Sequence, residues 1–359
     1  MADPQRRARP RWHAAGDVRL DPCEPGQPGP DEVLLAVAWC GICGSDLHEV
    51  ADGPHAIPVD RAHGLSHSRA PITMGHEFSG VVHAVGSRVA DVRPGDRVAV
   101  EPSYRCGRCV ACSEGRYEVC DHFGFAGLMG DGGMADYAVV PGYMVHRLPP
   151  DFDLASAAVL EPAAVALHAV RRSGFLAGQV VLVMGLGPVG LLVGALLRLR
   201  GASLVLGVDP VPSRREKARG LGVDLTLDPS EDVAAACRDA TGGSGAHLAY
   251  EVVGKQESVT TGLRSLRSGG ELMLIGLVPT AEIPVFDMVN AELHISTSVG
   301  YRDCHRELID LVSAGTLDLG SLVTRRIELD QAAATLTHDA LHGSTGAKTL
   351  VRCHPEASA

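Results

Sequence analysis

Two groups of cysteines in this sequence have spacings that suit chemistry. The first is Cys40 and Cys43, two residues apart in the stretch "WCGICGSDLHEV". Such a pair can be a redox disulfide, half of a zinc ribbon, or a coincidence in which one thiol acts alone. A redox pair belongs in a thioredoxin-like strand–helix–strand unit, whereas the neighbouring sequence is rich in the Val-containing runs of short strands. The redox reading is therefore disfavoured.

The second group is a run of four cysteines within 15 residues: Cys106, Cys109, Cys112 and Cys120. Four thiolates complete a tetrahedral Zn²⁺ site and leave no position for water or substrate, so such a zinc is structural. A four-cysteine iron–sulfur run usually has a different last spacing and a proline after its final cysteine, whereas Asp121 follows here. We predict a structural zinc lobe, with an iron–sulfur cluster or unrelated thiols as alternatives.

A glycine-rich turn follows an apolar run and opens a helical one, at Gly185, Gly187, Pro188, Val189 and Gly190. Gly185 permits the tight turn, Gly187 lets the backbone approach a pyrophosphate, and Gly190 allows the helix to pack closely on the strand. The N-terminus of that helix directs free N–H groups and the positive end of its dipole at the phosphates. The alternative is a glycine turn that binds no ligand.

Asp209 is expected to select the nicotinamide cofactor. It ends the next apolar run, 24 residues after Gly185, near the usual offset for the acidic residue that binds the ribose. An aspartate there accepts hydrogen bonds from the ribose hydroxyls and repels a 2′-phosphate, which favours NAD over NADP. Arg214 could instead receive such a phosphate.

Two patterns of secondary structure must position these groups. Residues 30–150 contain short Val-rich runs broken by Gly, Pro and Asp, which predicts antiparallel strands in a barrel-like β domain. From about residue 155, short apolar runs alternate with helical segments such as 214–222 and 257–266, which predicts a parallel, doubly wound sheet. After about residue 295 the pattern is mixed again.

Length, charge and hydropathy exclude several classes of protein. A chain of 359 residues suggests two domains, and a net charge of −11 argues against nucleic acid or anionic membrane as a partner. Residues 180–197 are 18 positions without a charge, but the central glycine turn favours strand, turn and helix over a membrane span. No apolar export signal precedes residue 30, so we expect a cytoplasmic protein whose cysteines are metal ligands and buried thiols.

Gly75-His76-Glu77 opens a longer pattern, GHE-x2-G-x5-G-x2-V, that ends at Val89. The pattern resembles the signature of the zinc-containing medium-chain alcohol and polyol dehydrogenases. The resemblance covers nearly the whole chain from about residue 12, including "CGICGSDLHE", the four-cysteine lobe, "GGMADYAVVP", "EPAAVALHAVRRSG" and the glycine turn. It is strongest to the sorbitol and 2,3-butanediol dehydrogenase branch, and the long stretch before His76 resembles the butanediol dehydrogenases.

This resemblance implies an α/β protein of two domains. A GroES-like β-barrel catalytic domain is expected over residues 1–160 and 299–359, with the structural zinc lobe at about 101–121. A Rossmann domain that binds NAD is expected over residues 161–298. The family also implies one catalytic and one structural Zn²⁺ per chain, and a homodimer or homotetramer.

The resemblance further implies the ligands of the catalytic zinc. Cys43 matches the thiolate ligand and His76 the imidazole ligand. The third ligand is left open between Glu77 and Glu161, because simple alcohol dehydrogenases have a second cysteine where this chain and the polyol branch have Glu161. Either glutamate could bind directly while the other acts through water, since an open catalytic zinc needs three protein ligands. Cys40 is then a buried thiol without a role.

Three further residues match the machinery of the family. Asp46 matches the carboxylate that orients the ring of His76. Ser45 is the hydroxyl nearest the metal, and protons are expected to leave from it through the cofactor ribose to His48. The alternative interpretation is that His48 is an exposed histidine on a helix and takes no part in proton transfer.

The expected reaction is oxidation of a secondary alcohol, because a zinc-bound alcohol ionises near neutral pH and can then give hydride to the nicotinamide. The expected substrate is a vicinal diol or polyol, resembling either 2,3-butanediol and acetoin or sorbitol. Cyclitols, amino alcohols and threonine-type substrates are alternatives within the family. A non-enzymatic zinc-ribbon module is the alternative outside it, and the acidic charge and the glycine turn count against that module.

Overall fold

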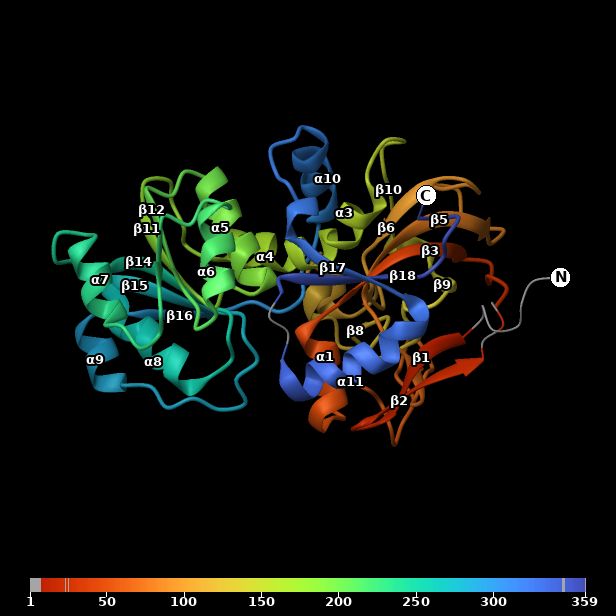
Figure 1. Cartoon of the computed structure of the whole chain (residues 1–359), viewed down its shortest axis with the longest axis horizontal. Helices are drawn as coiled ribbons and strands as arrows, with labels where there is room; N and C mark the ends of the chain where they lie inside the picture. Colours follow the sequence, from red (N-terminus) through yellow and green to blue (C-terminus); the bar gives the residue numbers. More distant parts are fainter. Residues whose placement is uncertain (1–7, 23, 25, 344–345, 359) are drawn as a thin grey trace. The chain divides into compact units, whose positions relative to one another are not determined.

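The computed structural model describes residues 8–22, 24, 26–343 and 346–358. These residues form two compact units (Figure 1). The first unit comprises the described residues up to Glu161 and those from His305 onward, and the second is Pro162–Cys304. The chain thus leaves the first unit once and returns to it.

The first unit consists mainly of antiparallel strands. Its largest sheet has the order β10-β6-β5-β3-β18-β17, with β9 also paired to β3. The strands of this sheet are β3 (Glu32–Ile42), β5 (Glu77–Val85), β6 (Arg97–Val100), β9 (Tyr137–Pro141), β10 (Val145–Arg147), β17 (Val323–Glu328) and β18 (Lys348–Arg352). Two smaller sheets contain β1 (Ala8–Ala14), β2 (Asp17–Pro22) and β4 (Ile72–Thr73), and β7 (Ser103–Tyr104) and β8 (Gly124–Phe125).

The helices of the first unit are short. The α-helices are α1 (Gly44–Asp52), α2 (Val110–Ser113), α3 (Leu154–Ala158), α10 (His305–Ser313) and α11 (Ala332–His342). Single 3₁₀ turns are η2 (Tyr117–Val119), η3 (Gly142–Met144), η4 (Gly320–Leu322) and η5 (Leu329–Gln331). Helix α4 (Leu160–Arg172) then carries the chain into the second unit.

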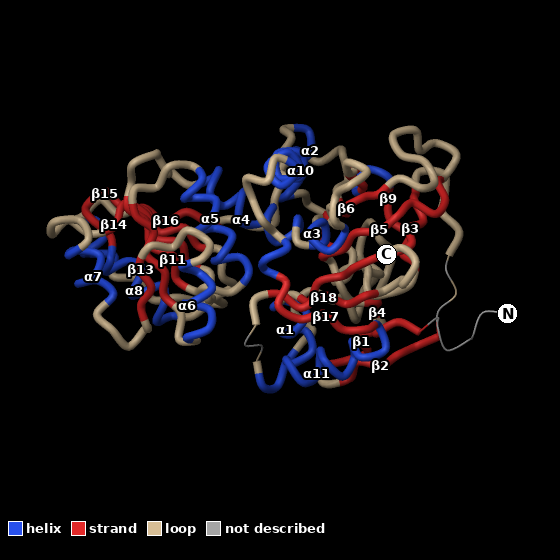
Figure 2. The backbone as a smooth tube through the Cα atoms, turned by 45° about the horizontal axis from the view of Figure 1, so that its top comes forward, coloured by secondary structure: helices blue, strands red, loops and turns tan. Residues whose placement is uncertain are grey.

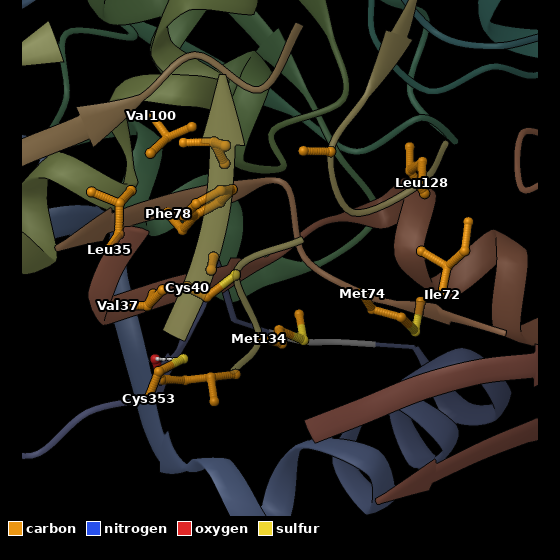
Figure 3. Close-up of a cluster of buried hydrophobic side chains, with 14 of the residues drawn as sticks. Leu35, Val37, Cys40, Ile72, Met74, Phe78, Val100, Leu128, Met134 and Cys353 are labelled. Carbon is orange, nitrogen blue, oxygen red and sulfur yellow. Dashed lines mark hydrogen bonds between the residues drawn. The ribbon is translucent and has the colours of Figure 1, made fainter. Parts of the chain in front are cut away.

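Strand β3 is the centre of the first unit. Its sequence EVLLAVAWCGI is apolar almost throughout, because the strand is buried on both faces rather than on one. Leu35, Val37 and Cys40 are fully buried and pack in the cluster shown in Figure 3, which also includes Phe78 of β5.

The second unit is a parallel sheet of six strands in the order β13-β12-β11-β14-β15-β16. The strands are β11 (Val180–Met184), β12 (Leu204–Val208), β13 (Leu225–Leu227), β14 (Ala246–Glu251), β15 (Leu266–Leu274) and β16 (His294–Thr297). The intervening helices are α5 (Pro188–Leu199), α6 (Pro212–Arg219), α7 (Val233–Asp239), α8 (Gln256–Ser265) and α9 (Val285–Asn290). Figure 2 shows the strands grouped together with helices around them.

The strand order reverses between β11 and β14, which are neighbours although two strands separate them in sequence. Open α/β sheets bind their ligands outside the carboxyl ends of the strands at such a point. The glycine turn at the end of β11 lies there. The predicted succession of an antiparallel β unit and a parallel, doubly wound unit is therefore confirmed.

The uncharged residues 180–197 form β11, the glycine turn and most of α5. Among the described residues, no helix combines the length and the apolar character needed to cross a membrane.

Candidate metal centre and cofactor site

Three potential zinc ligands meet where β3 ends and β5 begins. Cys43 follows the last residue of β3 and is the N-cap of α1, and His76 directly precedes β5. The two strands pair so that Gly41 lies opposite Glu77. As a result, the ligand atoms of Cys43, His76 and Glu77 all lie within 4.8 Å of one another.

Two glycines allow this close approach. Gly75 has a φ of +91°, which residues other than glycine rarely adopt. A Cβ at this position would also collide with the Cys40 thiol. A Cβ on Gly41 would collide with the carboxylate of Glu77. Cys40 itself lies in the apolar core, where burial raises the pKa of its thiol well above the usual value. It is therefore a neutral core side chain outside the ligand group.

Asp46 connects Cys43 and His76. Its Oδ2 accepts a hydrogen bond from the backbone N–H of Cys43 at 2.9 Å, and its Oδ1 lies 3.5 Å from Nδ1 of His76. Nδ1 of His76 thus lies on the side of Asp46 and Nε2 on the other side of the ring, where Ser45 Oγ lies 3.4 Å from it. His48 lies on the same helix, α1, with an exposed side chain.

Glu77 has a buried partner that sequence reasoning missed. Nζ of Lys348, in β18, lies 2.6 Å from both carboxylate oxygens of Glu77 and also donates to the carbonyl of Ile42 at 3.1 Å. The two side chains are 1% and 0% exposed. Burial lowers the pKa of Lys348, but the charges of Glu77 and Cys43 and the hydrogen bonding to Glu77 together raise that pKa above its ordinary value. Lys348 is therefore held in its charged form beside a buried carboxylate.

Glu161, the second candidate for the third zinc ligand, lies in the first turn of α4 and is buried. Its charge also acts to raise the pKa of Lys348, although less than that of Glu77. Among the described residues, however, the group with ligand atoms within 4.8 Å of one another contains Glu77 and not Glu161.

The four cysteines of the predicted lobe converge without forming disulfides. The Sγ atoms of Cys106 and Cys112 are 4.0 Å apart, and those of Cys109 and Cys120 are 3.8 Å apart. Sulfurs about 2.3 Å from one tetrahedral zinc are separated by about 3.8 Å, so the spacing fits that ion. Hydrogen bonds from backbone N–H groups lower the pKa of Cys106 and of Cys109, whereas burial raises the pKa of Cys112 and of Cys120.

The glycine turn of the second unit has the geometry of a phosphate-binding turn. Gly185 has a φ of +95°, and a Cβ on Gly190 would collide with the Gly185 carbonyl, so close packing requires glycine at both positions. Gly187 is the N-cap of α5, which begins at Pro188. A Cβ on Gly187 would point into open space, where a pyrophosphate would approach the backbone.

Asp209 holds this turn in place from the end of β12. Its Oδ2 accepts a hydrogen bond from Leu186 N at 2.9 Å, and its Oδ1 accepts one from Val211 N at 2.8 Å. Arg214 Nη1 lies 3.7 Å from the same carboxylate. Arg214 is therefore oriented toward Asp209, whose charge it partly balances.

Known proteins share both the sequence and the fold of this chain. Residues 29–150 match the family model for the alcohol dehydrogenase GroES-like domain, and residues 188–314 match that for the zinc-binding dehydrogenases. Over 324 residues the chain is 40% identical to an (R,R)-butanediol dehydrogenase of Bacillus subtilis, covering 89% of this chain and 92% of that protein. The chain belongs to the zinc-binding alcohol dehydrogenases.

Two other known proteins are also similar to this chain. A sorbitol dehydrogenase of Bacillus subtilis is 33% identical over 323 residues, which are 89% of each chain. A crystal structure from Sinorhizobium meliloti, assigned as a zinc-binding dehydrogenase and bound to NADP, has a TM-score of 0.88 at 33% identity, covering 96% of this chain and 98% of that one. The predicted GroES-like and Rossmann domains are confirmed, and the chain is an oxidoreductase of CH–OH groups that uses zinc and a nicotinamide cofactor.

Proposed function

We propose that this zinc-binding alcohol dehydrogenase oxidises a vicinal diol with NAD as the hydride acceptor. The grouping of Cys43, His76 and Glu77 carries the proposal, because thiolate, imidazole and carboxylate are the donors that an open catalytic zinc binds. The similar butanediol dehydrogenase supports a diol substrate, and the similar sorbitol dehydrogenase supports a longer polyol as the second candidate. A carboxylate in place of a second thiolate suits an oxygen-rich substrate.

In the proposed mechanism, Cys43, His76 and Glu77 would hold the zinc ion. Lys348 can keep its contact with the Glu77 carboxylate at the same time, because each carboxylate oxygen has a second lone pair for the metal. When bound, zinc supplies Lewis-acid activation of the alcohol, and the nicotinamide supplies the hydride acceptor. Glu161 lies outside this group of ligand atoms, so we assign it an indirect contact with the ion through a water molecule. Asp46 would keep Nε2 of His76 directed at the ion, and Ser45 Oγ would accept the proton of the alcohol as it passes its own hydroxyl proton on. The exposed His48 would end this relay by releasing a proton to solvent.

Oxidation of an alcohol panel tests the function. The panel contains the stereoisomers of 2,3-butanediol and acetoin, sorbitol, xylitol, cyclitols, threonine and simple secondary alcohols, with NAD or NADP. We expect the highest kcat/KM for a vicinal diol with NAD. A preference for threonine, or for an alcohol without a neighbouring hydroxyl, contradicts the proposal.

Variants of the two glutamates test the choice of the third ligand. Because only Glu77 lies with Cys43 and His76, Glu77→Gln is expected to weaken zinc binding by about 10-fold to 100-fold, the size of effect seen even for outer partners of a metal site. Glu161→Gln is the matched control and is expected to retain the zinc. Zinc per chain after dialysis against a chelator measures both, and the reverse order of retention contradicts the assignment.

The second zinc is proposed for the lobe of Cys106, Cys109, Cys112 and Cys120. Cys109→Ser is expected to remove this ion and lower the melting temperature, because binding energy at a structural zinc stabilises the fold. The control is Ser113→Ala, which changes an exposed hydroxyl of the same lobe and should keep both ions. Unchanged zinc content in Cys109→Ser contradicts the assignment.

The choice of NAD rests on Asp209. Replacing it with asparagine keeps its shape but removes the charge, which weakens the hydrogen bonds to the ribose and the repulsion of a 2′-phosphate. Hydrogen bonds to charged groups contribute about 1.5–3 kcal/mol, so we expect kcat/KM for NAD to fall about 10-fold to 100-fold. The NADP-to-NAD ratio of kcat/KM should rise. A wild-type preference for NADP, or an unchanged ratio in Asp209→Asn, contradicts this choice.

We also propose that the enzyme is a homo-oligomer that associates through the β16 side of its second unit. Strand β16 ends the order of its sheet, and unpaired strand edges are templates for association. Val285, Phe286 and Val289 on α9 are 59%, 80% and 70% exposed, which gives this side an apolar surface. Light scattering of wild type and Phe286→Asp tests the proposal, since the variant should shift toward the monomer.

A further inference from the structure

The first unit contains a third group of potential metal ligands, outside both proposed zinc sites. Glu101 directly follows β6, His146 is the middle residue of β10, and His305 is the first residue of α10. The antiparallel pairing of β10 with β6 aligns His146 with Ala99, and Glu101 N donates to Met144 O at 2.7 Å. The ligand atoms of the three side chains lie within 4.8 Å of one another.

A single carboxylate oxygen connects the two imidazoles. Nε2 of His146 lies 2.8 Å from Oε2 of Glu101, and Nδ1 of His305 lies 3.6 Å from the same atom. Oε1 of Glu101 lies 3.5 Å from Nη1 of Arg105. Glu101 and His305 are buried, whereas the His146 side chain is 30% exposed. The group is thus a nearly closed site with one side chain that reaches solvent.

The donor set of this group suits a cation. Glu101 is buried, and one of its carboxylate oxygens faces both imidazoles. Arg105 partly balances this carboxylate, and its guanidinium also stacks over the rings of Tyr117 and Tyr143. Two imidazoles and one carboxylate are a common ligand set for divalent transition metals.

We propose that Glu101, His146 and His305 bind a third divalent transition-metal ion of the Zn²⁺ class. Ligands about 2.0–2.2 Å from one tetrahedral zinc lie about 3.3 Å apart, and the two N–O distances of 2.8 and 3.6 Å bracket that value. The two rings stack with centroids 4.6 Å apart and planes 5° apart, so both cannot point at one ion as they stand. Binding therefore requires one ring to turn, and the half-buried His146 is the one with room to do so.

An ion at this site would connect three segments that are far apart in sequence. His305 is the residue at which the chain re-enters the first unit, and Arg105 directly precedes the first cysteine of the zinc lobe. The ion would therefore connect α10 to the sheet and to the base of the lobe. Its expected effect is on stability, because it binds the folded chain and not the unfolded one.

The test is a count of zinc ions in the full-length enzyme after equilibration with micromolar Zn²⁺. Wild type is expected to bind one ion more than His146→Phe or His305→Phe, in which phenylalanine preserves the aromatic stack without a ligand atom. The matched control is His338→Ala/His342→Ala, which removes an exposed pair of stacked histidines on α11, with ring centroids 4.7 Å apart. The control is expected to keep the third ion, which excludes adventitious binding to surface histidines.

Melting curves with and without added Zn²⁺ give a second readout. The ion should raise the melting temperature of wild type and of the control, and leave that of His146→Phe unchanged. Because His146 is partly exposed, this variant is expected to fold even if His305→Phe does not. Equal zinc counts in wild type and His146→Phe overturn the proposal, and so does loss of the additional ion in the His338→Ala/His342→Ala control. Cys43→Ser removes a different ion, so failure of the catalytic assignment and failure of this one are distinguishable.

Discussion

Cys43→Ser is expected to lose one zinc ion per chain and to lower kcat/KM by about 10³-fold or more. The thiolate is one of three donors grouped at the proposed catalytic site, and serine is a poor zinc ligand because its hydroxyl stays protonated. Lewis-acid activation of the alcohol contributes several kcal/mol to catalysis, and each 1.36 kcal/mol corresponds to about a factor of ten. Zinc counting and the rate of NAD reduction measure the two losses separately.

Cys40→Ser is the matched control, because it changes the other thiol of the same Cys-x-x-Cys spacing. Cys40 is fully buried, and its thiol donates to the Gly41 carbonyl at 3.7 Å. Serine there places a hydroxyl in an apolar core, which costs about 1–3 kcal/mol of stability but leaves the ligands in place. Full zinc content in Cys43→Ser, or loss of zinc in a folded Cys40→Ser, contradicts the assignment of Cys43.

The sequence predicted correctly those parts of the structure whose residues lie close together along the chain. The four cysteines of the lobe lie within 15 residues, so their convergence requires only short turns. Likewise, the strand, glycine turn and helix around Gly185 are contiguous, and Gly185 and Gly190 have steric reasons that apply to any chain with this turn. The ligand pair Cys43 and His76 was accessible only through resemblance to a family, because spacing alone does not show that β3 and β5 are neighbours.

The missed residues are those whose role depends on long-range pairing. Lys348 stands in the run "AKTLVR", and a lysine there is typical of an exposed strand position. Its burial follows from the pairing of β18 with β3, which brings Lys348 to Ile42 across 306 positions of sequence. A lysine at the start of a short strand that also contains Thr349 and Arg352 does not identify a buried partner. His305 and Glu101 are a second example, since they come together only when the chain returns to the first unit.

Breaking the Glu77–Lys348 pair is expected to have the largest effect on stability. Lys348→Met keeps the length of the side chain but removes the charge that balances Glu77, leaving a carboxylate that is 0% exposed. Loss of one partner of a buried ion pair costs about 3–5 kcal/mol, because the remaining charge stays out of water. The free energy of unfolding in urea, measured for each protein after zinc has been removed with a chelator, should fall by that amount relative to wild type.

Two further variants separate the ion pair from a simple packing effect. Lys255→Met changes an exposed lysine in the same way and should leave the free energy of unfolding almost unchanged. Glu77→Gln/Lys348→Met removes both charges, so it should be more stable than Lys348→Met alone if an unbalanced carboxylate causes the loss. An equally unstable double variant would show that the alkyl chain of Lys348, rather than its charge, supports β18.

Zinc removal gives a second measure of the same pair, because Glu77 is also the proposed zinc ligand. In Lys348→Met, zinc would be the only cation left beside the Glu77 carboxylate. Chelation of zinc should therefore lower the free energy of unfolding of Lys348→Met more than that of wild type.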